Sequence, residues 1–255
     1  MIKMILTDLD HTLLKQNGSI SDATLDILNE CRKKGMVLTI ATARYWIGAE
    51  RYIRLLKPDY EITTDGTLIH SAEDCIYSSS FSVHETNMIV RSLLDRIPNA
   101  EITVANGKTV YWNSKHISES EKLHKAIYND YSSKLSIEAN KIVAELPDET
   151  IAKEISDNVG CKLQCYRGER WYSFLPKGSG KTAAIEALSK ISKISTDEIV
   201  SFGDDDNDIE MLKMCGQGIA VANAVKEVLD IADDITLSND EDGVAIWLKE
   251  HCLFD

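Results

Sequence analysis

Two aspartates stand two residues apart where the first apolar run of the chain ends. Residues 2–6 are mostly apolar and lead through Thr7 into Asp8 and Asp10. A short apolar run of this kind predicts a buried β-strand. In open α/β sheets ligands bind outside the carboxyl ends of the strands, so two carboxylates at that position indicate a reactive site. Two neighbouring acids suit acid–base chemistry, in which one is ionised while the other carries a proton.

A hydroxyl, a guanidinium and an ammonium group follow in two later segments. The apolar stretch 37–41 predicts a second strand, and Thr42 and Arg44 come directly after it. Lys181 stands at the head of a predicted helix, behind a glycine-containing loop. The helix dipole disfavours a cation at that end unless an anion compensates, so Lys181 indicates an anionic partner.

A cluster of acids marks the fourth segment. Residues 199–203 predict another buried strand, and four aspartates lie within the next five residues, at positions 204, 205, 206 and 208. Carboxylates at this density repel one another, and a bound divalent cation relieves the repulsion. Hard oxygen ligands favour Mg²⁺, which we therefore expect as the cofactor.

The four segments together resemble the motifs of the haloacid dehalogenase (HAD) superfamily of phosphotransferases. The nucleophile motif DxDxT matches residues 8–12, and the acidic motif GDxxND matches residues 203–208. The Ser/Thr motif corresponds to Thr42 and the lysine motif to Lys181. Their order and spacing look like the Cof-type sugar-phosphatase branch (type IIB, C2 cap), which carries a large cap between the second and third motifs.

The resemblance implies a Mg²⁺-dependent phosphatase that acts on a small phosphate monoester, such as a sugar phosphate. Asp8 would attack the phosphorus and form an aspartyl-phosphate. Asp10 would protonate the leaving alkoxide and then activate the water that completes hydrolysis. The implied metal ligands are Asp8, the backbone carbonyl of Asp10, Asp204 and, directly or through water, Asp208.

The resemblance also implies the groups that bind the phosphoryl oxygens. Thr42 and Lys181 would contact the oxygens on which charge accumulates in the transition state. Asn207 would position Lys181 or the phosphate, and Arg44 is a further phosphate-binding candidate. Asp205 and Asp206 are expected to face solvent.

Two positions depart from the family pattern. His11 follows the second aspartate, where the family usually has glycine, and we expect it to be exposed. Asp65 precedes Gly66 where the family has an Asn-Gly turn. A negative charge there predicts discrimination against diphosphorylated or acidic substrates.

The predicted elements indicate an α/β fold. Residues 1–81 and 178–255 alternate strands and helices, which predicts a doubly wound parallel sheet, the Rossmann-like HAD core. Residues 82–177 mix hairpins and helices and are expected to form an inserted α+β cap domain. Within the cap we expect helices at 83–96 and about 119–133, and a hairpin turned at Asn106-Gly107.

Substrate selection is expected to reside in the cap, which would cover the site and contact the non-reacting part of the substrate. Large or charged side chains are the candidates: Trp112, His116, Arg167, Arg170 and Trp171.

Composition limits the class of partner. The net charge of −13 argues against nucleic acid, and no apolar run is long enough to cross a membrane. The N-terminal run leads directly into the Asp8 motif and does not resemble a signal peptide, so we expect a cytoplasmic protein. The expected partner is a small phosphorylated metabolite, with the chain a monomer or homodimer.

Other functions fit the same motifs less well. A phosphomutase would use the same intermediate, and a non-catalytic phosphometabolite-binding protein would have no use for Asp10. A dehalogenase would not need the second acid. The sequence Gly180-Lys181-Thr182 resembles the end of a P-loop, but Leu175 stands where that motif requires glycine.

Overall fold

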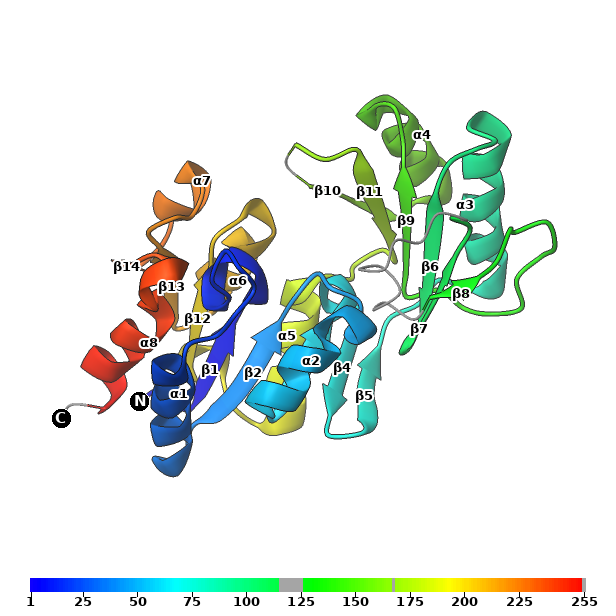
Figure 1. Ribbon diagram of the computed structural model, residues 1–255. Helices are drawn as coiled ribbons and strands as arrows, with labels where there is room; N and C mark the ends of the chain where they lie inside the picture. The colour runs from blue at the N-terminus through cyan, green and yellow to red at the C-terminus, as the bar shows by residue number, and fades with distance from the viewer. Residues whose placement is uncertain (115–125, 167, 254–255) are drawn as a thin grey trace.

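The computed structural model describes residues 1–114, 126–166 and 168–253, which form two sheets with their helices. Figure 1 shows that the chain passes from the first sheet into the second and then returns, so that both termini belong to the first. We call the first sheet the core sheet and the second the cap sheet. No helix in the described part of the chain combines the length and apolar composition needed to cross a bilayer.

The core sheet has eight strands in the order β14-β13-β12-β1-β2-β3-β4-β5. They are β1 (Met4–Thr7), β2 (Val37–Ala41), β3 (Tyr60–Thr63), β4 (Leu68–Ser71), β5 (Asp74–Ser78), β12 (Ile199–Gly203), β13 (Gln217–Val221) and β14 (Asp234–Thr236). All pairings from β14 to β3 are parallel, as the alternating pattern predicts. The antiparallel hairpin of β4 and β5 extends the sheet at one edge and was not predicted.

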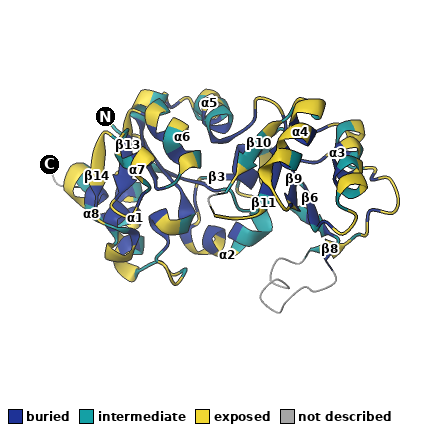
Figure 2. Cartoon of the chain, turned by 90° about the horizontal axis from the view of Figure 1, so that it is seen from above, coloured by how far each residue is buried: buried dark blue, intermediate teal, exposed yellow. Residues whose placement is uncertain are grey.

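Helices cover both faces of the core sheet, so the sheet is doubly wound. They are α1 (Asp22–Lys33), α2 (Trp46–Leu56), α5 (Lys181–Ser192), α6 (Ile209–Met214), α7 (Lys226–Leu229) and α8 (Gly243–Leu248). Figure 2 shows α5 and α6 on one side of the sheet and α2 on the other. Because both faces are covered, the central strand β1 is apolar along its length, and Met4, Ile5 and Leu6 are almost completely buried.

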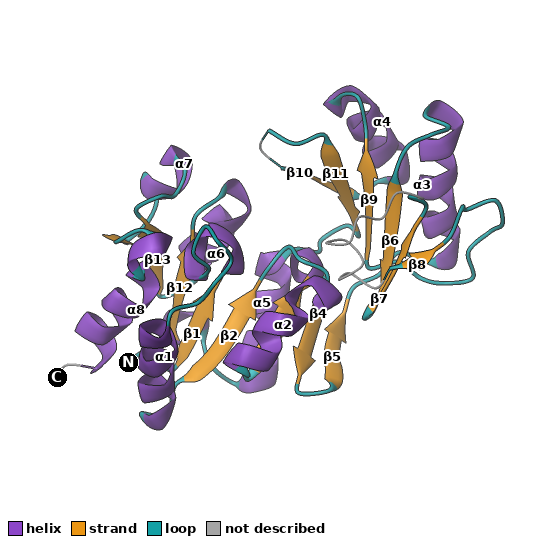
Figure 3. Cartoon of the chain, viewed as in Figure 1, coloured by secondary structure: helices purple, strands orange, loops and turns teal. Residues whose placement is uncertain are grey.

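The cap sheet has the order β10-β11-β9-β6-β7-β8 within the described residues. Its strands are β6 (Ile102–Asn106), β7 (Thr109–Trp112), β8 (Ile127–Tyr128), β9 (Lys141–Glu145), β10 (Lys162–Cys165) and β11 (Trp171–Leu175). Figure 3 shows the helices α3 (Val83–Arg96) and α4 (Glu149–Val159) beside this sheet. The predicted turn between β6 and β7 is confirmed, with Gly107 at a positive φ of 55°.

Strand periodicity gives the cap sheet two different faces. Ile102, Val104 and Ile142 belong to an apolar cluster with residues of α3 and α4. The intervening residues Thr103 and Val143 point to the opposite face, which lines a cavity against the core.

One predicted cap element is wrong. In the range 119–133, for which we expected a helix, residues 119–125 lie outside the described part, and residues 126–133 form the short strand β8 and a loop. Asn129 accepts a hydrogen bond from the backbone N–H of Tyr131 at 2.8 Å, and Asp130 accepts one from Ser132 at 3.0 Å. Such local side-chain bonds stabilise turns in competition with a helix.

Candidate active site

The carboxyl ends of three adjacent parallel strands bring the predicted residues together. β1 pairs with β12 on one side and with β2 on the other. Asp8 follows β1, Thr42 follows β2 and Asp204 follows β12, so the three side chains share one edge of the sheet. All three are buried.

Lys181 reaches this edge from the first turn of α5. Its Nζ lies 2.6 Å from an oxygen of Asp8 and 2.6 Å from an oxygen of Asp208. The helix start is held close by Gly66, which has a φ of +81°; a Cβ atom there would lie 2.3 Å from the carbonyl carbon of Gly180. The anionic partners expected for Lys181 are therefore two aspartates of the site itself.

Asp208 fixes the acidic loop as well as the lysine. One of its oxygens accepts the bond from Lys181, and the other accepts from the backbone N–H groups of Asp204 (3.1 Å) and Asp205 (3.3 Å). We expected Asn207 to hold Lys181 or the phosphate. In the described structure Asp208 is the residue of this loop that bonds to Lys181, so the role of Asn207 stays a prediction.

Three carboxylates converge closely enough to share a cation. One oxygen each of Asp8, Asp204 and Asp208 lie within 4.8 Å of one another. Among the described residues, Asp8 and Asp204 each keep one oxygen without a hydrogen bond, while both oxygens of Asp208 are engaged. This donor set suits Mg²⁺, which prefers carboxylates and keeps several waters. It favours Asp8 and Asp204 as direct ligands.

Thr12 orients the Asp204 carboxylate. Its hydroxyl is buried and donates to an Asp204 oxygen at 2.6 Å. The DxDxT motif predicts a structural role for Thr12 in supporting this loop, and the bond shows that it also holds a proposed metal ligand.

Burial and mutual repulsion make the acids reluctant to ionise. Burial, more than the neighbouring carboxylates, raises the pKa of Asp8 well above its ordinary value despite the attraction of Lys181. Burial likewise raises the pKa of Asp204 to about 7. Burial alone would lower the pKa of Lys181, but Asp208 and Asp8 raise it overall, so the lysine stays charged.

Magnesium is expected to stabilise the protein more at pH 8 than at pH 5.5. The pKa of Asp204 is about 7 in the folded protein and 3.8 ordinarily, so the folded state binds more protons between these values. This group therefore makes the metal-free protein less stable as pH rises from about 4 to 7. A cation relieves that penalty and binds only the ionised acid. The measurement is the Tm with Mg²⁺ and with EDTA at both pH values; an equal rise at both would contradict the expectation.

The second aspartate is engaged by arginine. Arg44 donates to both oxygens of Asp10, from Nε at 2.7 Å and from Nη2 at 2.6 Å. Its guanidinium also lies 5.3 Å from the ring centre of Tyr52. The hydrogen bond to Asp10 raises the pKa of Arg44. In this structure the predicted phosphate ligand therefore contacts the predicted acid–base residue.

His11 occupies a backbone conformation that favours glycine. Its φ is +58°, and Asn223 donates to its carbonyl oxygen at 2.7 Å. Its side chain is exposed, as expected. The turn thus explains why glycine is common at this position in the family that the sequence resembles.

Comparison with known proteins identifies the family. The family model described as haloacid dehalogenase-like hydrolase matches residues 5–248, which is nearly the whole chain. The chain belongs to the haloacid dehalogenase-like hydrolase family. The fold, with an α+β cap between β5 and α5, is similar to that of the HAD subclass IIB sugar phosphatase BT4131, with a TM-score of 0.84 at 23% identity over 99% of this chain and 100% of that chain. The family is one of hydrolases, so the chain is an enzyme of that class.

Several relatives match this HAD chain over nearly its full length. It is 24% identical to the 5-amino-6-(5-phospho-D-ribitylamino)uracil phosphatase YitU of Bacillus subtilis, covering 97% of both chains. It is 26% identical to the putative phosphatase YxeH of the same organism, covering 98% of both. A haloacid dehalogenase-like hydrolase from Bacteroides thetaiotaomicron has the same fold, with a TM-score of 0.83 at 22% identity over 100% of both chains.

The cap of this HAD enzyme contacts the core through a buried ion pair. Nζ of Lys141, the first residue of β9, lies 2.5 Å from an oxygen of Asp65. Lys141 also donates to the Ala43 carbonyl at 3.1 Å and to the Tyr166 hydroxyl at 2.9 Å. Both charged side chains are only 6% exposed. The negative charge that we expected at Asp65 is thus paired, and Lys141 is a residue that sequence analysis missed.

Replacing Asp65 with asparagine is expected to destabilise the protein by about 3 kcal/mol, because it leaves the Lys141 ammonium buried without a counter-charge. The double variant Asp65→Asn/Lys141→Met should recover most of the loss. Urea unfolding of both single variants and the double variant measures these changes in the free energy of unfolding.

The control is Glu73→Gln, which breaks an exposed pair between core and cap, Lys108–Glu73 at 3.3 Å. It should change stability by less than about 0.5 kcal/mol. If the losses in free energy of unfolding caused by Asp65→Asn and Lys141→Met simply added up in the double variant, the expectation would be contradicted.

The predicted cap candidates differ in position. Trp112 and Trp171 line a cavity of about 390 Å³ between cap and core, together with Arg44. Arg170 is not among the residues that line it. His116 and Arg167 lie outside the described residues.

Proposed function

We propose that this enzyme is a Mg²⁺-dependent phosphatase that hydrolyses a small phosphate monoester, such as a sugar phosphate or related metabolite, through an aspartyl-phosphate on Asp8. The observation that supports this most directly is the convergence of three buried carboxylates with Lys181 at one sheet edge. Buried carboxylates that repel one another lower the stability of the fold, and such clusters are typical of active sites.

Each residue has a distinct role in the proposed reaction. A carboxylate oxygen of Asp8 bonds to phosphorus as the bond from phosphorus to the leaving alkoxide breaks, and Asp10 gives that alkoxide a proton. Water then attacks the phosphorus, the Asp8–phosphorus bond breaks and Asp10 takes the proton of the water. Lys181 and Thr42 donate to the phosphoryl oxygens. Bound Mg²⁺, with Asp8, the Asp10 carbonyl and Asp204 as proposed direct ligands and Asp208 as a ligand directly or through water, would neutralise negative charge on the phosphoryl group.

Arg44 connects substrate binding to the release of the Asp10 side chain. The Asp10–Arg44 pair is partly exposed, with side chains 42% and 31% accessible, so it can exchange partners. We propose that the dianionic phosphate attracts Arg44 away from Asp10. The Asp10 carboxyl is then free to face the leaving group and give it a proton.

The cap supplies the remaining part of the site. We propose that residues 82–177 act as a cap domain over a core of residues 1–81 and 178–255, with the leaving group between them. The cavity beside Arg44 supports this. The B. subtilis relative is named as a phosphatase of a small phosphorylated metabolite, which favours the same size of substrate here.

Phosphate release from a panel of phosphorylated metabolites tests the proposal. Release that needs Mg²⁺ and stops with EDTA is the expected result. No release from any monoester by the folded protein would contradict it. Transfer of phosphate to a sugar acceptor would then indicate a phosphomutase, and tight binding without transfer would indicate a binding protein.

A further inference from the structure

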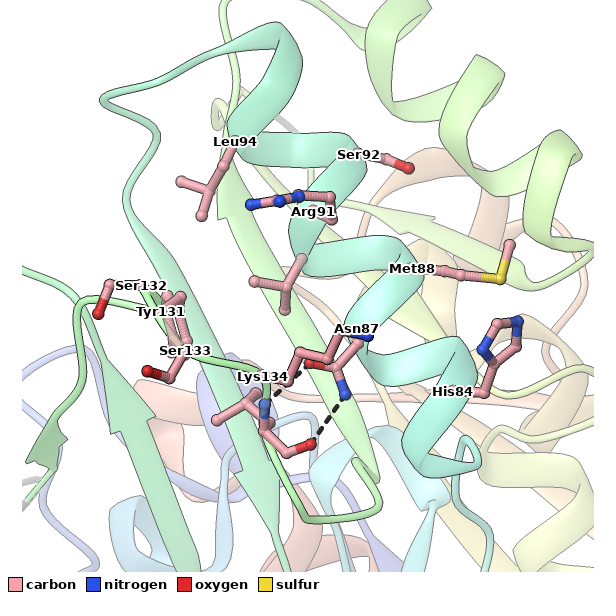
Figure 4. A pocket seen from close by; sticks show the side chains of 12 residues that line it. His84, Asn87, Met88, Arg91, Ser92, Leu94, Tyr131, Ser132, Ser133 and Lys134 are labelled. Carbon is pink, nitrogen blue, oxygen red and sulfur yellow. Dashed lines mark hydrogen bonds between the residues drawn. The ribbon is translucent and has the colours of Figure 1, made fainter.

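Described residues of the cap line at least two cavities. One, of about 360 Å³, lies between α3 and residues 131–135 (Figure 4). There the side chain of Asn87 bonds to both the N–H and the carbonyl of Leu135, and no residue assigned to the reaction lines the space. The other, of about 390 Å³, lies between core and cap. Its core wall includes Ala43 and Arg44, which directly follow Thr42, so it adjoins the proposed phosphoryl site.

The cations beside the second cavity are already paired. Arg44 is engaged by Asp10, and Lys141 by Asp65. The three N–H groups of the Lys141 ammonium are matched by Asp65, the Ala43 carbonyl and the Tyr166 hydroxyl. Of the cations in the described lining, Lys141 is paired and Arg44 is the proposed ligand of the reacting phosphate, so neither offers a counter-charge to a second anionic group.

The hydroxyl groups of the cavity are also engaged. The hydroxyl of Tyr45 lies 2.6 Å from that of Thr103. The hydroxyl of Tyr166 bonds to Asp65 at 2.9 Å and to Ser173 at 2.8 Å. The further polar side-chain groups of the described lining are the Glu169 carboxylate and the indole N–H of Trp112, which has no hydrogen-bond partner among the described residues. A polyol placed here would give up more hydrogen bonds to water than these groups replace, which costs free energy for each unpaired hydroxyl.

Aromatic and branched side chains supply most of the remaining wall. Tyr45 comes from the core, and Trp112, Trp171, Val110 and Val143 come from the cap. Walls of this kind bind flat rings by stacked and edge-on contacts. A small, mostly apolar pocket with few free polar groups accepts a ring more readily than a hydrated chain.

We propose that this cavity selects phosphate monoesters whose leaving group carries a flat aromatic or heteroaromatic ring and no second charge. The inference rests on the proposed phosphatase function and narrows its substrate class. The phosphate lies at Asp8, and the ring lies between Tyr45 and Trp171 in the cavity that begins beside Thr42.

Three primary monoesters of similar size test the proposal: benzyl phosphate, cyclohexylmethyl phosphate and glucose 6-phosphate. We expect kcat/KM for benzyl phosphate to exceed that for cyclohexylmethyl phosphate by about two- to tenfold and that for glucose 6-phosphate by at least about tenfold. Equal or better hydrolysis of glucose 6-phosphate would overturn the ring preference and leave the phosphatase function intact. No hydrolysis of any ester would overturn both.

Variants of the lining residues test whether the preference for an aromatic ring arises in this cavity. Trp171→Leu should reduce the ratio of kcat/KM for benzyl phosphate over cyclohexylmethyl phosphate toward one, and Tyr45→Leu should do the same if the first variant does not fold. The matched control is Tyr77→Leu, in β5 of the core sheet and outside the cavity lining, which should keep the ratio of the wild type. A ratio unchanged in Trp171→Leu and Tyr45→Leu would overturn the assignment of the ring to this cavity.

Discussion

Asp8→Asn is expected to reduce kcat by at least about 10⁴-fold, the scale of loss seen when a nucleophile is removed. An amide does not attack phosphorus, and the substitution also removes one proposed Mg²⁺ ligand. The fold should persist, because Lys181 keeps its second partner, Asp208, at 2.6 Å. Phosphate release by wild type and variant, with circular dichroism to verify folding, measures the effect.

The matched control is Asp26→Asn. Asp26 is an exposed aspartate of α1, so the same chemical change is made away from the site. It should leave kcat and KM unchanged. A folded Asp8→Asn variant that kept more than a hundredth of the wild-type rate would show that Asp8 is not the nucleophile, since even the loss of an acid–base group typically costs about 10²- to 10⁴-fold.

Lys181→Met is expected to reduce kcat by about 10³-fold, because the variant lacks the ammonium that offsets charge on the phosphoryl oxygens. It also leaves Asp8 and Asp208 buried without their shared cation. The variant should therefore unfold at a lower temperature, and Mg²⁺ should recover part of that stability without restoring kcat. Tm and kcat measured with and without Mg²⁺ separate the two effects.

The control on the same helix is Lys190→Met, at an exposed position in the last turn of α5. Neither its activity nor its response to Mg²⁺ should change. Recovery of wild-type kcat by Mg²⁺ in Lys181→Met would show that the lysine only relieves repulsion between the acids and takes no part in transfer.

The sequence was sufficient to predict which residues meet at the sheet edge. Asp8, Thr42 and Asp204 each follow an apolar run typical of a covered parallel strand, and such strands align their carboxyl ends. Their meeting therefore follows from topology. The same logic predicted Lys181, because a cation at a helix start needs an anion.

Side-chain partners could not be predicted in the same way. Asp65 and Lys141 are 76 positions apart, and only the docking of cap on core brings them to 2.5 Å. Neither the pattern around Lys141 nor that around Tyr166 indicates this contact. Likewise the sequence predicts that Arg44 lies near the phosphate, but it does not predict which group its side chain contacts. In this structure the guanidinium bonds to Asp10.

Local chemistry explains the error in the cap. The range 119–133 was assigned to a helix, but Asn129 and Asp130 bond to backbone N–H groups two residues ahead. These bonds stabilise turns. They depend on side-chain geometry, which the spacing of apolar residues in the sequence does not reveal.

The central claim is a covalent phosphoryl-enzyme at Asp8, and the most direct test is to trap it in Asp10→Asn. An aryl phosphate with a good leaving group needs no general acid, so transfer to Asp8 should proceed while water attack, which needs Asp10 as base, stalls. The variant is mixed with p-nitrophenyl phosphate and Mg²⁺, quenched in acid, digested and analysed by mass spectrometry. The account predicts one phosphoryl group on Asp8. A phosphoryl group on another residue, or an unmodified Asp8 during undiminished turnover, would contradict it.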